Sequence, residues 1–131
     1  MSKLVPRRGA VTVEMAITAP ILFLFLFASL EFASMNNMRH SVDNAAYEAA
    51  RRGIVPGATA AAVVNEANTI MGYVGARNAT VTVVPNAFDD NTPELTVTVS
   101  VPIAGNGWVT PFFYDAADMI TGQCRLRRED Y

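Results

Sequence analysis

The sequence predicts an α+β fold: a long N-terminal helix, a second helix and a three-stranded antiparallel sheet. Three observations predict it. An apolar stretch near the N-terminus is long enough to cross a bilayer, helix-period patterns continue as far as residue 72, and strictly alternating patterns occupy the C-terminal half. The chain of 131 residues therefore consists of an anchor and one small domain.

The apolar stretch lies between two acidic residues, Glu14 and Glu31. The sixteen residues from Met15 to Leu30 carry no charge, and the 21 residues that begin at Ala10 and end at Leu30 carry one. A helix of about 20 mostly apolar residues crosses the hydrocarbon core of a bilayer. The sequence therefore predicts a transmembrane helix here.

Basic residues precede this stretch and acidic residues follow it. Lys3, Arg7 and Arg8 come before it, with no acid among the first nine residues, whereas three acids and one basic residue lie between Glu31 and Ala50. Positive charge stays on the cytoplasmic side. We therefore expect a basic cytoplasmic leader at residues 1–9, a transmembrane helix at 10–30 across the bacterial inner membrane, and a periplasmic or otherwise extracytoplasmic α+β domain at 31–131.

Three interpretations of the N-terminal segment compete. A cleaved secretory signal has a shorter apolar core, of about 7–15 residues, and is not expected to carry an acid such as Glu14 at its start. A plain single-pass anchor explains the length of the stretch but not the spacing between Gly9 and Glu14. The third interpretation depends on a resemblance to a known family.

The run Arg8-Gly9-Ala10-Val11-Thr12-Val13-Glu14 resembles the prepilin-peptidase site of type IV pilins, in which the cut follows the glycine and a glutamate is fifth in the mature chain. The longer stretch RRGAVTVEMAITAPILFLFLFASLEF, with the Ala-rich helix that ends in AARRG, is similar to the TadE-like family. These are minor pilins or pseudopilins of tight-adherence (Flp-type) pilus systems. The resemblance implies a cleavage site between Gly9 and Ala10, and helix docking and assembly roles for Glu14, Pro20 and Glu31.

The chemistry of the cleavage site suits these residue types. Gly9 is small and flexible, as a scissile position requires. Cleavage would give Ala10 a charged amine four residues from Glu14, on the same helix face. That amine would pair with Glu14 of the same chain or of a neighbour and offset the free-energy cost of an acid in lipid. In the blander interpretation, Glu14 lies near the interface and stabilises the helix N-terminus.

Pro20 and Glu31 have structural interpretations as well. Pro20 cannot donate a hydrogen bond to the carbonyl of Ala16, so we expect a kink there. Glu31 marks the outer edge of the membrane in its simplest interpretation. Beyond it the helix pattern continues to Arg52, giving a helix about 60 Å long from Val11. Its apolar stripe comprises Phe32, Met35, Met38, Val42, Ala45, Ala46 and Ala49.

A second helix and three strands follow. Gly53 and Pro56 end the first helix, and Thr59 caps a second helix over residues 60–72. Alternation of apolar and polar residues predicts strands at about 79–85 and 94–102, joined by a long turn-rich loop, and a third strand at 120–127 after a short helical turn at 115–119. Asp89, Asp90 and Glu94 do not follow a calcium-loop spacing, so we interpret this loop as a solvated turn.

An aromatic segment from Trp108 to Tyr114 precedes the third strand. It has two interpretations: a plug over the open end of the small core, or a contact surface for another pilus component. The single cysteine, Cys124, excludes an intramolecular disulfide, and the sequence assigns it no role.

Composition gives no indication of catalysis. The chain has a net charge of −2, one histidine and no Gly-rich phosphate loop, so we expect no enzyme activity, no cofactor or metal, no nucleic-acid partner and no small-molecule substrate. The favoured function is structural, with membrane lipid, other pilin subunits and the prepilin peptidase as partners. The alternative is an uncleaved single-pass envelope protein whose outer domain binds a periplasmic partner.

Overall fold

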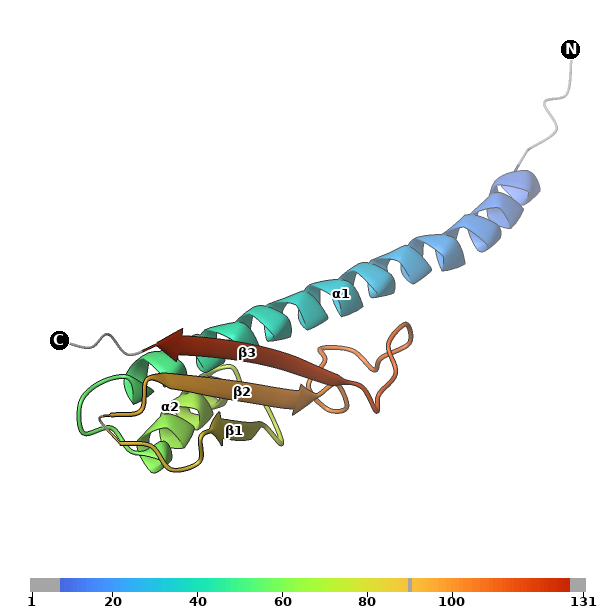
Figure 1. Cartoon of the computed structure of the whole chain (residues 1–131). Helices are drawn as coiled ribbons and strands as arrows, with labels where there is room; N and C mark the ends of the chain where they lie inside the picture. Colours follow the sequence, from blue (N-terminus) through green and yellow to red (C-terminus); the bar gives the residue numbers. More distant parts are fainter. Residues whose placement is uncertain (1–7, 90, 128–131) are drawn as a thin grey trace, which may run out of the picture.

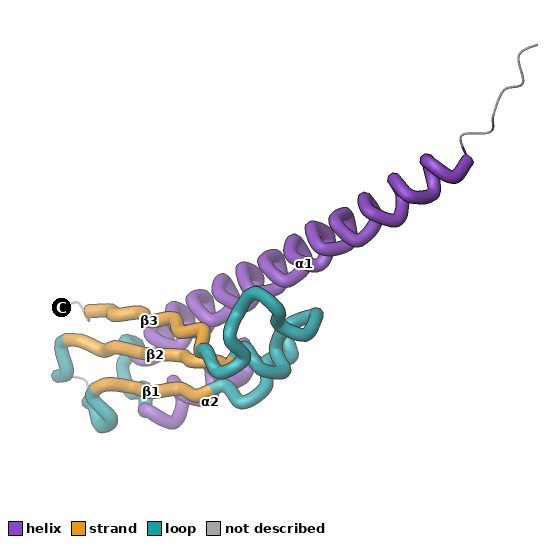
Figure 2. Tube along the Cα trace, turned by 90° about the vertical axis from the view of Figure 1, so that its right-hand side faces the viewer, coloured by secondary structure: helices purple, strands orange, loops and turns teal. Residues whose placement is uncertain are grey.

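The computed structural model describes residues 8–89 and 91–127, and its architecture is α+β (Figure 1 and Figure 2). Two helices, α1 (Arg8–Gly53) and α2 (Ala60–Tyr73), cover one face of a sheet made of β1 (Thr80–Val84), β2 (Glu94–Pro102) and β3 (Met119–Arg127). The predicted fold class is confirmed. Residues 1–7 of the expected leader, Asp90 and the last four residues lie outside the described part of the chain.

The sheet is an antiparallel meander with the strand order β1-β2-β3. Val97 in the central strand pairs with Val83 on one side and with Cys124 on the other. The alternation that predicted β2 separates its two faces: one set of side chains is buried under the helices, and the threonines between them are only partly buried. The buried set is Leu95, Val97, Val99 and Val101.

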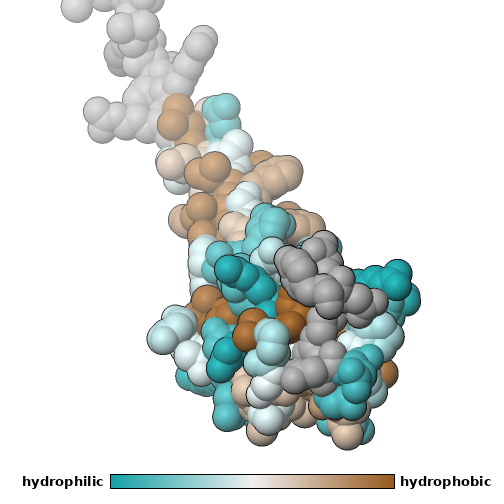
Figure 3. All heavy atoms as spheres, turned by 60° about the vertical axis from the view of Figure 1, so that its left-hand side comes forward, coloured by the Kyte–Doolittle hydropathy of each residue, from teal (hydrophilic) through white to brown (hydrophobic). Residues whose placement is uncertain are grey.

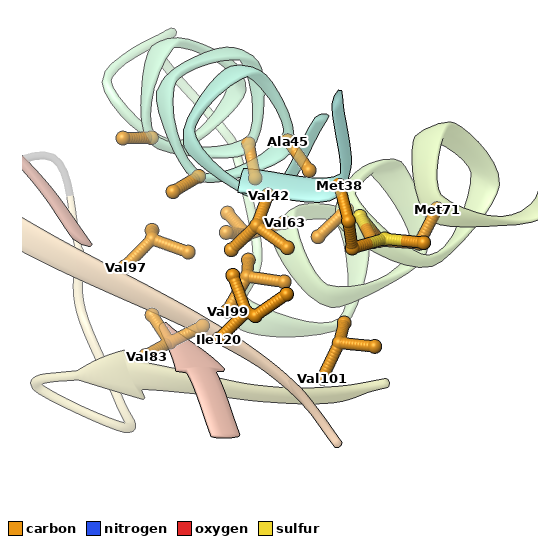
Figure 4. Close-up of a cluster of buried hydrophobic side chains, with 14 of the residues drawn as sticks. Met38, Val42, Ala45, Val63, Met71, Val83, Val97, Val99, Val101 and Ile120 are labelled. Carbon is orange, nitrogen blue, oxygen red and sulfur yellow. The ribbon is translucent and has the colours of Figure 1, made fainter. Parts of the chain in front are cut away.

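The second half of α1 supplies most of the helical side of the core. Side chains of α1, α2 and the sheet point toward one another in Figure 4. The predicted stripe is buried except at Phe32, which is 54% exposed. The buried members of the stripe are Met35, Met38, Val42, Ala45, Ala46 and Ala49, and α2 contributes Val63, Ala67 and Met71.

Local signals position the helix ends close to where they were predicted. The Thr59 side chain caps α2 by accepting a hydrogen bond from the Ala62 N–H at 3.2 Å, which confirms that cap. Gly53 ends α1 where the chain passes against the sheet: a Cβ there would lie 2.1 Å from Leu95 Cδ2 and 3.0 Å from Val63 Cγ2. Glycine at this position therefore permits close packing as well as helix termination.

The connection from β2 to β3 differs from the prediction. Residues 115–118 form a turn, closed by a hydrogen bond from Asp118 N–H to Asp115 O at 3.1 Å, and β3 starts one residue earlier than expected, at Met119. Asn106 holds the start of this connection. Its Oδ1 accepts from Arg77 N–H at 2.7 Å, and its Nδ2 donates to Arg77 O and Pro102 O at 3.0 and 2.8 Å.

Asn106→Ala removes all three of these hydrogen bonds from a side chain that is 8% exposed. Because their backbone partners lose a protein acceptor or donor, we expect the free energy of unfolding to fall by about 2–3 kcal/mol. Urea titration of the full chain in detergent micelles measures the change. Asn91→Ala, at an exposed loop position, is the control and should alter stability by less than about 0.5 kcal/mol. Equal effects of the two substitutions would contradict the bridging role of Asn106.

Candidate functional site

The first half of α1 projects from the domain with its apolar side chains uncovered (Figure 1 and Figure 3). It contains an 18-residue window that is apolar enough to cross a membrane, and none of that window is buried in protein. The large apolar side chains from Val11 to Leu30 are 37–69% exposed. A soluble protein rarely exposes so large a continuous apolar surface. The helix therefore fits a single-pass membrane protein.

The residues of the predicted cleavage site lie in the first turn of this helix. The helix begins at Arg8, two residues before the predicted transmembrane helix, so Gly9 and Ala10 are both helical, and both are exposed. A Cβ built on Gly9 meets no other atom within 4 Å. Glu14 follows one turn later and is also exposed, on the same face as Ala10. The structure thus leaves Gly9, Ala10 and Glu14 accessible to another protein.

Pro20 lies within α1, and the helix continues through it without interruption (Figure 1). On each side of Pro20, one hydroxyl group donates a hydrogen bond to a backbone carbonyl of the helix. Thr18 Oγ1 donates to Glu14 O at 2.9 Å, and Ser29 Oγ donates to Phe25 O at 2.8 Å. Such bonds satisfy polar groups that a bilayer cannot solvate.

Glu31 is buried, with 2% of its surface exposed, although it directly follows the uncharged stretch. Its Oε1 accepts three backbone N–H groups, from Phe112 at 3.0 Å, Phe113 at 2.9 Å and Tyr114 at 3.1 Å. Hydrogen bonds to a carboxylate are stronger than those between neutral groups. Glu31 therefore holds the segment 108–114, which we call the aromatic loop, against α1.

Two further side chains of α1 hold the aromatic loop. Ser34 is buried, and its Oγ accepts a hydrogen bond from Trp108 N–H at 3.0 Å. The ring of Phe32 stacks on Phe113 with centroids 6.4 Å apart and meets the edge of Tyr114 at 5.5 Å. Sequence reasoning missed Ser34 and the acceptor role of Glu31, because these contacts join residues more than 70 positions apart. The sequence contains one indication that this segment could lie against the apolar helix, namely the absence of charge from residue 104 to residue 114.

The aromatic loop does not plug the core as one interpretation expected. Trp108, Phe112 and Phe113 are 64%, 79% and 47% exposed, and only Tyr114 packs against the buried core. That interpretation is therefore wrong for the first three. Between the loop and the helix lies an apolar groove of about 340 Å³, lined by Leu24, Phe27, Glu31, Val109, Thr110, Phe112 and Phe113.

Cys124 lies on β3 beside Val97 and is partly buried. Burial raises the pKa of its thiol. Since the thiolate is the reactive form, the side chain is a weak nucleophile at neutral pH.

The match to a known family falls on the helix that carries these residues. Residues 9–51 match the family model described as TadE-like protein. Neither the curated proteins nor the solved structures contain a match to the chain. The matched range begins at Gly9 and ends two residues before the end of α1. Over these residues the chain is similar to the TadE-like family, which suggests association with a tight-adherence pilus and its pilins.

Proposed function

We propose that the chain is a minor pilin or pseudopilin that takes part in assembling a tight-adherence (Flp-type) pilus or a related secretion apparatus. The observation that carries this proposal is the uncovered apolar half of α1, which lies within the range matched to the TadE-like family. A helix of this kind buries its surface in lipid before assembly and against other pilin helices afterwards. The role is structural and requires no catalytic group in the domain.

The proposed topology follows from charge. Basic residues at positions 3, 7 and 8 keep the N-terminus in the cytoplasm, and α1 crosses the inner membrane from there. The remainder of α1 enters the domain and forms part of its core. The domain is then held directly outside the inner membrane, on a helix that continues without a linker.

In this proposal the prepilin peptidase cuts between Gly9 and Ala10, which removes the first helical positions. The new amine of Ala10 pairs with Glu14 of the same chain or of a neighbouring subunit. Pro20 belongs to the helix surface that docks with other subunits, since it is exposed. Glu31 has a different role from these residues. Its carboxylate is buried under the aromatic loop, so it supports docking indirectly by fixing the domain on the helix.

Gly9→Leu tests the processing step. In cells with the cognate peptidase, we expect the mature wild-type chain to begin at Ala10 and the Gly9→Leu chain to retain residues 1–9, because a bulky side chain at the scissile position blocks cleavage. Mass spectrometry of membrane-extracted protein measures the difference. Gly72→Leu is the matched control, since a Cβ there also meets nothing within 4 Å, and it should be processed normally.

The result that contradicts processing is a wild-type chain that retains residues 1–9 although the peptidase is active on another pilin. That result would favour the uncleaved envelope protein, whose domain binds a periplasmic partner.

A further inference from the structure

We propose that the aromatic loop is a second membrane contact, in which Trp108, Phe112 and Phe113 enter the outer surface of the bilayer beside α1. This inference depends on the proposed function only in requiring that α1 spans the membrane. Four observations carry it: the depth of the loop along the helix, the bonding of its backbone, its lack of charge and its exposed aromatic side chains.

The depth follows from the geometry of α1. The 21 residues from Ala10 to Leu30 extend about 31 Å at 1.5 Å per residue, close to the roughly 30 Å thickness of the hydrocarbon core. Glu31 therefore lies at the outer boundary of that core. Phe112 and Phe113 share a groove with Leu24 and Phe27, which lie one to two turns closer to the bilayer centre.

Trp108 lies farther out than the two phenylalanines. Its backbone bonds to Ser34, which is about 4–5 Å farther from the bilayer centre than Glu31 along α1. The loop thus spans the level where hydrocarbon gives way to headgroups. Trp and Tyr concentrate at this level in membrane proteins because one part of the ring is apolar and another forms hydrogen bonds.

The backbone of the loop meets the main requirement for entering lipid. A backbone N–H that leaves water without a new acceptor costs several kcal/mol. Ser34 accepts from Trp108, and Glu31 accepts from Phe112, Phe113 and Tyr114. Pro111 has no N–H. At five of the seven loop positions, the backbone therefore has no N–H group that needs water as its acceptor.

The loop also has the composition and place of an interfacial segment. No charged residue lies between residues 104 and 114, and the nearest acid, Asp115, follows the loop. Both Figure 1 and Figure 2 show the connection from β2 to β3 at the end of the domain that faces the projecting half of α1. The exposed aromatic surface is thus continuous with the apolar helix, and the bilayer that covers the helix reaches it. Attachment at two places fixes the tilt of the domain over the membrane.

Trp108 is the only tryptophan, so its fluorescence reports the position of the loop directly. The full chain is reconstituted in phosphatidylcholine vesicles and separated from unbound protein by flotation. We expect Trp108 emission to be blue-shifted, quenched severalfold by lipids brominated near the headgroup, and protected from acrylamide. Phe112→Ser combined with Phe113→Ser removes two exposed rings, together with the stacking of Phe113 on Phe32, and should reduce the lipid quenching by at least half.

A matched reporter outside the membrane provides the control. The variant Trp108→Phe with Tyr47→Trp moves the tryptophan to an exposed position on α1, 16 residues and about 24 Å beyond Glu31. That tryptophan should be accessible to acrylamide and unaffected by brominated lipid.

The outcomes separate the two proposals. A chain that does not float with the vesicles refutes the membrane-spanning role of α1. A chain that floats while Trp108 remains accessible to acrylamide and unquenched by lipid refutes the loop contact alone. Protection without lipid quenching, increasing with the protein-to-lipid ratio, also refutes it and assigns the loop to contact with a second copy of the chain.

Discussion

Gly122→Val is expected to reduce the free energy of unfolding of the domain by about 3 kcal/mol or more, at the upper end of what an overpacked core costs. Gly122 lies on β3 at a position where α1 packs closely against the strand. A Cβ there would be 2.5 Å from Asp43 Oδ1, 2.9 Å from Val42 Cγ1 and 3.0 Å from Asp43 N. Because the last of these atoms belongs to the backbone, a side chain at residue 122 separates α1 from β3.

Thermal or urea unfolding of the full chain in detergent micelles measures this effect. Thr121→Val is the matched control, since it places the same side chain at the neighbouring, exposed position of β3. We expect that control to change the free energy of unfolding by less than about 1 kcal/mol. If both variants unfold at the same urea concentration, the close approach of α1 and β3 is wrong.

Glu31→Ala is expected to release the aromatic loop from α1. Three backbone N–H groups lose their shared carboxylate acceptor, and a net loss of about 3 kcal/mol is consistent with hydrogen bonds to a charged group. Amide hydrogen exchange at Phe112, Phe113 and Tyr114 should therefore accelerate by about 100-fold, since each 1.4 kcal/mol is roughly a factor of ten. Exchange within the core strand β2 should change far less.

Two other substitutions sharpen this test. Glu31→Gln keeps one carbonyl oxygen but loses the charge, so its exchange rates should fall between those of the wild type and Glu31→Ala. Glu48→Ala removes an acid of the same helix whose Oε2 is paired with Arg51 at 3.5 Å, and it should leave the loop protected. Unchanged exchange at residues 112–114 in Glu31→Ala would show that other contacts hold the loop.

The elements were predictable because their patterns are local. Leu95 to Val101 alternates without a break and becomes the central strand, with one face buried. The apolar positions of α1 recur every three or four residues, and those beyond Phe32 form the core. Thr59 caps α2 through its own side chain, a contact only three residues long. Periodicity and capping depend on near neighbours, so a single sequence contains them.

The junction between anchor and domain was not predictable in the same way. An acid at the end of an apolar stretch is ordinarily solvated, and nothing near Glu31 in sequence indicates that the N–H groups of residues 112–114 will meet it. Phe32 fits the helical stripe but remains 54% exposed, and its ring contacts Phe113 and Tyr114 of the aromatic loop. Gly122 likewise has no local signal, because its need for glycine arises from Asp43 on another element.

Protease digestion of intact spheroplasts tests most directly the claim that α1 spans the membrane with the domain outside. We expect added protease to degrade the domain and to leave a membrane-embedded fragment that contains the apolar stretch, with the same protection whether or not residues 1–9 have been removed. A full-length chain that stays intact until the spheroplasts are lysed, and then appears in the soluble fraction, would contradict the account.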